Sequence, residues 1–211
     1  MLENLQAQAK ERQTTRSASR SWCGSDQAQV HPLVFDLSAS VYTLQYDGRL
    51  DREIKTCLMV LEAFARADKG RFKWDIVGHS GDQVIIPLVK SDKLPTNDGQ
   101  RYEIIRSITA YTQYCDSGDN TLASIKKSVE EVATDEADDD FGCALSDANL
   151  SRYGIGAASL GQALRMNAQV KTAIISLDKG QESHILARQL PGKAFAASDR
   201  HKSCRTFCSA F

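Results

Sequence analysis

The sequence predicts an α/β protein in which a mostly parallel central sheet carries helices on both faces. Short runs of apolar residues alternate along the chain with stretches whose apolar residues recur every three or four positions. Such alternation is typical of parallel sheets, because parallel neighbours need a crossover connection. The length of 211 residues, with 42% hydrophobic and 25% charged residues, favours one ordinary domain with a substantial core.

The first 29 residues differ in character from the rest of the chain. They are rich in Ser, Thr, Gln and Arg and show little apolar periodicity, so we interpret residues 1–29 as an N-terminal leader or linker and residues 30–211 as the domain. Arginines beside hydroxyl residues are faintly typical of a transit peptide, but Glu3 and Glu11 count against one.

The elements of the domain follow in order from residue 33. The run Leu33, Val34 and Phe35 predicts the first strand, and helical spacing of apolar residues predicts helices over residues 50–65, 104–111 and 122–132. Further strands are expected over residues 74–77, 84–89, 141–145 and 170–177, with a short helix around Leu160 and Leu164 before the last of them. Pro87 would keep the strand over residues 84–89 at an edge of the sheet.

One carboxylate and two hydroxyls stand together directly after the first strand. Asp36, Ser38 and Ser40 occupy alternate positions of one tight loop. In an α/β sheet, ligand groups gather outside the carboxyl ends of the strands, which is where an Asp that closes a buried strand lies. Mg²⁺ prefers oxygen ligands, so this loop is a candidate half of a divalent-cation site. An ordinary turn is the alternative.

Two distant segments complete the candidate site. Thr121 precedes a helical pattern and presents a hydroxyl at a helix N-terminus, and Asp147 follows a second short apolar run. The five residues together resemble the metal-ion-dependent adhesion site of von Willebrand factor A domains, which are Rossmann-like. The resemblance implies that Ser38, Ser40 and Thr121 touch Mg²⁺ or Mn²⁺, and that Asp36 and Asp147 act mainly through water.

Further segments are similar to a narrower family. These are the stretches DGRLDR from residue 47, DIVGHSGD from residue 75, SGD from residue 117 and LSDANLSRYGI from residue 145. They resemble the C-terminal region of a family of large mitochondrial ATPases of the AAA class that carry an A domain at that end. The resemblance implies a mitochondrial location. This chain has no G-x-x-x-x-G-K-[ST] segment, so we do not expect it to be the ATPase.

The chain also departs from that family in three places. His31 and Pro32 stand where the family strand would be apolar, so we expect the first strand to begin late. Gly142, Cys143 and Ala144 are small for a fully buried strand, which predicts loose packing at the sheet centre. Residues 204–211 are short for a terminal helix that covers the sheet, as if the domain were truncated.

Composition limits the partners. A formal net charge of -1 leaves no basic footprint for nucleic acid, and no apolar run approaches the length of a membrane span. Six irregularly spaced cysteines without a secretion signal favour free thiols in a reducing, intracellular compartment. A cation held by neutral hydroxyls keeps an open position, and the resemblance implies that an Asp or Glu of a partner protein fills it.

Three other hypotheses remain open at this stage. Ser80 in the segment GHSGD is similar to a hydrolase nucleophile elbow, although Asp82 replaces the final glycine. Asp36 could instead be an acylphosphate nucleophile, but the second acid that this chemistry usually needs is replaced by Ser38. The third hypothesis, an alternative to a metal-dependent binding module, is a structural or regulatory fragment whose metal site is vestigial. His201 with Cys204 and Cys208 lacks a fourth zinc ligand.

Overall fold

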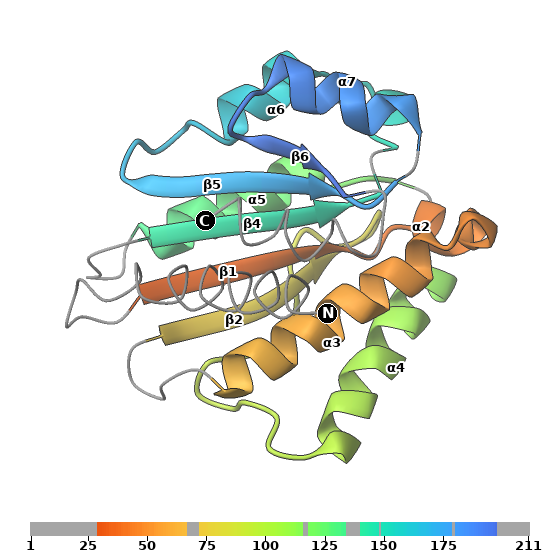
Figure 1. The fold of residues 1–211 in the computed structure, drawn as a ribbon, viewed down its shortest axis with the longest axis vertical. Coiled ribbons are helices and arrows are strands. Elements are labelled where there is room, and N and C mark those ends of the chain that lie inside the picture. The colour runs from red at the N-terminus through yellow and green to blue at the C-terminus, as the bar shows by residue number, and fades with distance from the viewer. Residues whose placement is uncertain are drawn as a thin grey trace, which may run out of the picture.

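A six-stranded sheet forms the centre of the computed structural model, which describes residues 29–66, 72–115, 118–133, 140–147, 149–178 and 180–197. The strand order is β3-β2-β1-β4-β5-β6, as Figure 1 shows for most of the sheet. All neighbouring strands are parallel except β3, which runs antiparallel to β2. The strands are β1 (Gln29–Asp36), β2 (Phe72–His79), β3 (Ile86–Val89), β4 (Asp140–Ser146), β5 (Val170–Ser176) and β6 (Ala194–Ala196).

Helices cover both faces of this sheet, as predicted. They are α2 (Ala39–Thr43), α3 (Arg49–Arg66), α4 (Asp98–Tyr114), α5 (Thr121–Val132), α6 (Ala157–Ala163) and α7 (Gln181–Gln189), with short 3-10 helices η1 (Gln45–Asp47) and η2 (Ser151–Tyr153). Alternation along β1 separates two cores: Phe35 packs with α3 and α4, whereas Val34 packs with α5, α6 and α7. In Figure 1, α3 and α4 lie together on the near side of the sheet.

The first strand begins earlier than predicted. β1 pairs with β2 along its full length from Gln29, so the expectation of a late start is wrong. Its pairing with β4 joins Val30 to Asp140 and Leu33 to Cys143 but has no partner for His31 or Pro32. Proline has no N–H to donate, so a central strand accommodates it by leaving the ladder open on one side. The edge position predicted from Pro87 is confirmed, since β3 ends the sheet.

The small residues of β4 leave space beneath α5. A cavity of about 10 Å³ lies between Val34, Ile125, Gly142, Ala144 and their neighbours. This volume is at the lower limit for one water molecule. The cavity agrees with the loose packing predicted here. The tail over residues 204–211 lies outside the described residues.

Replacement of Gly142 by Ala is expected to raise the free energy of unfolding by about 0.5–1 kcal/mol. Alanine lowers the conformational entropy of the unfolded chain, and it can adopt the strand conformation without strain. The added Cβ would meet Thr172 Cγ2 at 3.6 Å, an ordinary contact. Urea denaturation measures the change. Gly154→Ala is the control: its φ of 72° disfavours any side chain, so this variant should lose stability. A less stable Gly142→Ala protein contradicts the prediction.

Candidate metal centre

The carboxyl ends of β1, β2 and β4 bring the predicted residues to one edge of the sheet. Asp36 is the last residue of β1, and His79, the last residue of β2, lies opposite it in the ladder. Asp147 directly follows β4, the other neighbour of β1. The strand order therefore places side chains that are far apart in sequence at the same edge.

A membrane-crossing helix is not found in the described part of the chain.

Asp36, Ser38 and Ser40 form a continuous hydrogen-bonded group. The Ser38 hydroxyl donates to Asp36 Oδ1 at 2.5 Å, and the Ser38 main-chain N–H donates to the same oxygen at 3.0 Å. The two serine Oγ atoms are 3.0 Å apart. All three side chains are buried, with Ser40 the most exposed at 5%. The loop thus places the side-chain oxygen atoms of these three residues next to one another.

Asp147 reaches this group through Asp36. Its main-chain N–H lies 3.5 Å from Asp36 Oδ2, and the Ser146 hydroxyl donates to the same oxygen at 3.1 Å. The Asp147 carboxylate accepts from the Asn149 N–H and from Arg49 Nη1, each at 2.9 Å. Ser146 was missed by the sequence analysis; its place as the last residue of β4, beside the predicted Asp147, could have revealed it.

Thr121 joins the same edge through a histidine. It is fully buried at the start of α5, and its Oγ1 lies 3.2 Å from His79 Nε2. Because His79 is the ladder partner of Asp36, this contact connects Thr121 to the carboxyl edge of the sheet. Thr121 is connected to Ser38 and Ser40 only indirectly, through its contact with His79. His79 is the last residue of β2, whereas the strand predicted from the sequence ended at residue 77.

Burial and mutual repulsion dominate the electrostatics of the site. Burial, followed by the negative charges of Asp147 and Asp119, raises the pKa of Asp36 to about 8. Burial lowers the pKa of His79 to about 4, which keeps this ring neutral. Burial also raises the pKa of Glu53 on α3 well above its usual range, with Asp36 and Asp147 adding to the effect. The site therefore concentrates carboxyl groups that are costly to ionise without a further cation.

A buried arginine supplies part of the missing positive charge. Arg49, at the start of α3, contacts Asp147 at 2.9 Å, Asp47 at 2.6 Å and Asp178 at 3.5 Å. Its side chain is only 9% exposed. Arg49 belongs to the segment DGRLDR, but its sequence context assigns it no role, because charged residues of an amphipathic helix usually face solvent.

The donor set fits a hard divalent cation. Serine and threonine hydroxyls with nearby carboxylates are the oxygen ligands that Mg²⁺ and Mn²⁺ accept. Glu53 Oε1 and His79 Nδ1 are buried atoms without a hydrogen-bond partner among the described residues, so the polar groups around this edge are incompletely satisfied. Among the described residues, no three His, Cys, Asp or Glu side chains cluster as they would around a metal ion, so a site here depends on hydroxyl ligands as well.

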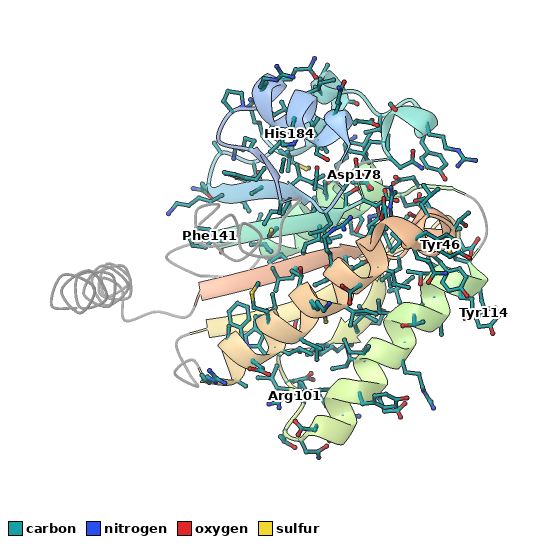
Figure 2. The ribbon with its side chains drawn as sticks, turned by 45° about the vertical axis from the view of Figure 1, so that its right-hand side comes forward. Tyr46, Arg101, Tyr114, Phe141, Asp178 and His184 are labelled. Atoms are coloured by element: carbon teal, nitrogen blue, oxygen red, sulfur yellow. The ribbon has the colours of Figure 1, made fainter. Side chains whose placement is uncertain are left out.

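The geometry gives no support to a Ser80 nucleophile. Ser80 is buried, and its Oγ accepts from the main-chain N–H groups of Asp82 and Gln83, both at 3.2 Å. That is the bonding of a serine that stabilises its own turn. His184 lies exposed on α7 (Figure 2). His201, with Cys204 and Cys208, lies outside the described residues, whereas Cys57, Cys115 and Cys143 are free thiols.

Solved structures with low sequence identity share this fold, which is that of a von Willebrand factor A domain. BatB from Bacteroides thetaiotaomicron matches with a TM-score of 0.58 and 10% identity, over 86% of this chain and 96% of that one. The PilB minor pilin of Streptococcus sanguinis matches with a TM-score of 0.59 and 14% identity, over 88% and 61%. Manganese-loaded TRAP from Plasmodium vivax matches with a TM-score of 0.50 and 13% identity, over 86% and 72%.

Sequence comparison narrows the class to one family. The chain is 42% identical over 173 residues to mouse von Willebrand factor A domain-containing protein 8, which covers 81% of this chain. The chain belongs to the family of von Willebrand factor A domain-containing protein 8. It spans only 9% of the length of that relative. No family model matches the chain.

Proposed function

We propose that this chain is a metal-ion-dependent protein-binding module. Asp36, Ser38, Ser40, Thr121 and Asp147 would hold Mg²⁺ or Mn²⁺, with the hydroxyls as direct ligands. The observation that carries the proposal is the buried, hydrogen-bonded group of Asp36, Ser38 and Ser40, next to Asp147 at one sheet edge. When bound, the cation supplies an electrophilic position that accepts a carboxylate oxygen from an Asp or Glu of a partner protein.

The residues around the site would set its charge and shape. Arg49 holds the Asp147 carboxylate by a 2.9 Å contact, and Ser146 holds Asp36. His79 stays neutral and fixes the Thr121 hydroxyl. Such outer partners orient ligands and tune a bound metal. One structural neighbour, TRAP, is described as manganese-loaded, which supports the choice of ion.

Family membership extends the proposal. By its relation to the ATPase family, the module would act in mitochondria and derive from the C-terminal domain of an AAA-type ATPase, over residues 30–211, with residues 1–29 as a linker. It is not proposed to be an enzyme, since ATP hydrolysis would belong to other domains of such a protein. Nucleic acid and membrane lipid are not proposed as partners.

Thermal unfolding with Mg²⁺ or with EDTA tests the metal site. A ligand that binds only the folded protein stabilises it, by about 2.7 kcal/mol at a hundred times its dissociation constant. We expect the melting temperature of the parent protein to rise with millimolar Mg²⁺ and that of Thr121→Ala to stay unchanged. Thr172→Ala, which removes a buried hydroxyl near the amino end of β5, should respond as the parent does.

Two results would contradict this expectation. If Mg²⁺ leaves the melting temperature of the parent protein unchanged, the alternative function is favoured, which is a structural or regulatory fragment whose metal site is vestigial. If Mg²⁺ raises the melting temperature of Thr121→Ala as much as that of the parent, the threonine is not a ligand. Calorimetric titration of Mg²⁺ into both proteins gives the same comparison without heating.

A further inference from the structure

An exposed group of aromatic and aliphatic side chains borders the candidate metal centre. We name it the tyrosine patch: Leu44, Tyr46, Tyr111 and Tyr114. Tyr46 is 96% exposed and Tyr114 is 79% exposed, and the other two are exposed to about 40%. Large apolar surface left in water in this way marks interaction sites when it is contiguous.

The tyrosine patch lies on two parts of the chain, and both are joined to the loop over residues 36–40. Leu44 and Tyr46 follow Ser40 by four and six residues, across α2 and η1. Tyr114 ends α4, and the next residue, Cys115, donates from Sγ to the Leu37 carbonyl at 3.3 Å, within the loop between Asp36 and Ser38. Helices α2 and α4 pack against each other. Figure 2 shows Tyr46 and Tyr114 projecting at the same end of the molecule.

The charge distribution distinguishes this end of α4 from the other. The amino half of the helix carries Asp98, Arg101, Glu103 and Arg106, whereas no charged residue follows Arg106 within α4. Tyr111 and Tyr114 are three residues apart, so they lie on one helix face. The segment from Val41 to Tyr46 also has no charge. Enrichment in tyrosine with depletion of charge is the composition of an interface core.

We infer that the tyrosine patch is the docking surface for apolar residues that flank the acidic residue of the partner. This inference rests on the proposed metal-dependent function and specifies its partner: a protein segment in which Asp or Glu stands close to Phe, Trp or Leu. An uncharged, tyrosine-rich surface beside a cation is complementary to an acid with apolar neighbours. The carboxylate of the partner makes binding depend on the metal, and the tyrosines of this chain form the hot spot of the interface.

A library of random peptides displayed on phage, selected on the full chain in millimolar Mg²⁺, tests the inference. The enriched peptides should carry Asp or Glu within a few positions of Phe, Trp or Leu. Fluorescence anisotropy should show that Tyr46→Ser with Tyr114→Ser weakens their binding by about tenfold or more. The Mg²⁺ dependent rise in melting temperature should be the same in this variant as in the parent, because neither tyrosine is a ligand.

Tyr102→Ser is the matched control. Tyr102 is 65% exposed on the same helix, roughly 18 Å along the axis from Tyr114. It neighbours Arg101, which Figure 2 places away from Tyr46 and Tyr114. This variant should bind the enriched peptides within about twofold of the parent, on the reasoning that contacts outside an interface contribute little. The single variant Tyr46→Ser removes an almost fully exposed side chain, so loss of folding cannot explain its effect.

The possible failures are distinguishable. Peptides that need Mg²⁺ but lack apolar residues, and that bind the tyrosine variant as tightly as the parent, overturn the patch and leave the metal site standing. Peptides that bind equally in EDTA and to Thr121→Ala overturn the metal-dependent function on which the inference rests. A selection without any binder overturns the inference as well. Sedimentation velocity that shows a dimer dissociated by Tyr46→Ser would assign the patch to a second copy of the chain instead.

Discussion

Replacement of Arg49 by Met is expected to lower the free energy of unfolding by about 3–5 kcal/mol, because it leaves buried carboxylates without their cation. Arg49 Nη1 lies 2.9 Å from Asp147, whose side chain is 2% exposed, and Nη2 lies 2.6 Å from Asp47. Methionine keeps much of the apolar stem, so lost packing contributes little. Urea denaturation in EDTA at neutral pH gives the number.

A surface ion pair on the same helix provides the control. Lys55 and Asp51 are 2.5 Å apart, but their side chains are 47% and 53% exposed. Exposed pairs contribute at most about 1 kcal/mol, so Lys55→Met should change stability little. The double variant Arg49→Met with Asp147→Asn should recover part of the loss, since it removes the carboxylate left without a partner. An Arg49→Met protein no less stable than Lys55→Met would contradict the assigned role of the arginine.

Arg49 also illustrates what the sequence could not reveal. The helix over residues 50–65 was predicted correctly from its apolar residues, and α3 confirms it. Its charged residues Arg49, Arg52 and Glu53 are nevertheless buried. Periodicity gives no reason for this, because the partner Asp147 is 98 residues away and meets Arg49 only through the strand order. Long-range charge pairing is absent from local sequence patterns.

The candidate site was predictable to the extent that its groups are local or end a strand. Asp36, Ser38 and Ser40 lie within five residues, and their spacing alone brings their oxygen atoms together. Thr121 and Asp147 could be named because each stands at an element boundary. His79 was assigned no role from the sequence, since its place opposite Asp36 depends on the register of β1 and β2. The late start expected for β1 failed because one open side of a ladder suffices to accommodate Pro32.

Asp36→Asn is expected to stabilise the protein without metal and to lose this advantage when Mg²⁺ is bound. In EDTA the folded protein retains the Asp36 proton up to about pH 8, whereas the unfolded chain releases it near pH 3.8. The folded state then binds more protons between these values, so the free energy of unfolding of the parent falls as pH rises through them. Asparagine does not titrate, and its Oδ1 can still accept from Ser38.

The variant should therefore be more stable than the parent in EDTA at pH 7, by on the order of 4 kcal/mol, and this advantage should disappear towards pH 4. In saturating Mg²⁺ the order should shift towards the parent, because a bound cation stabilises the ionised carboxylate that asparagine lacks. Chemical denaturation across this pH range, with EDTA or Mg²⁺, measures both effects. Asp92→Asn, in an exposed loop, should follow the parent throughout. If Mg²⁺ raises the free energy of unfolding of Asp36→Asn as much as that of the parent, Asp36 takes no part in holding a metal. If the free energies of unfolding of the two proteins in EDTA run parallel at every pH, the Asp36 carboxylate is not costly to ionise in the folded protein.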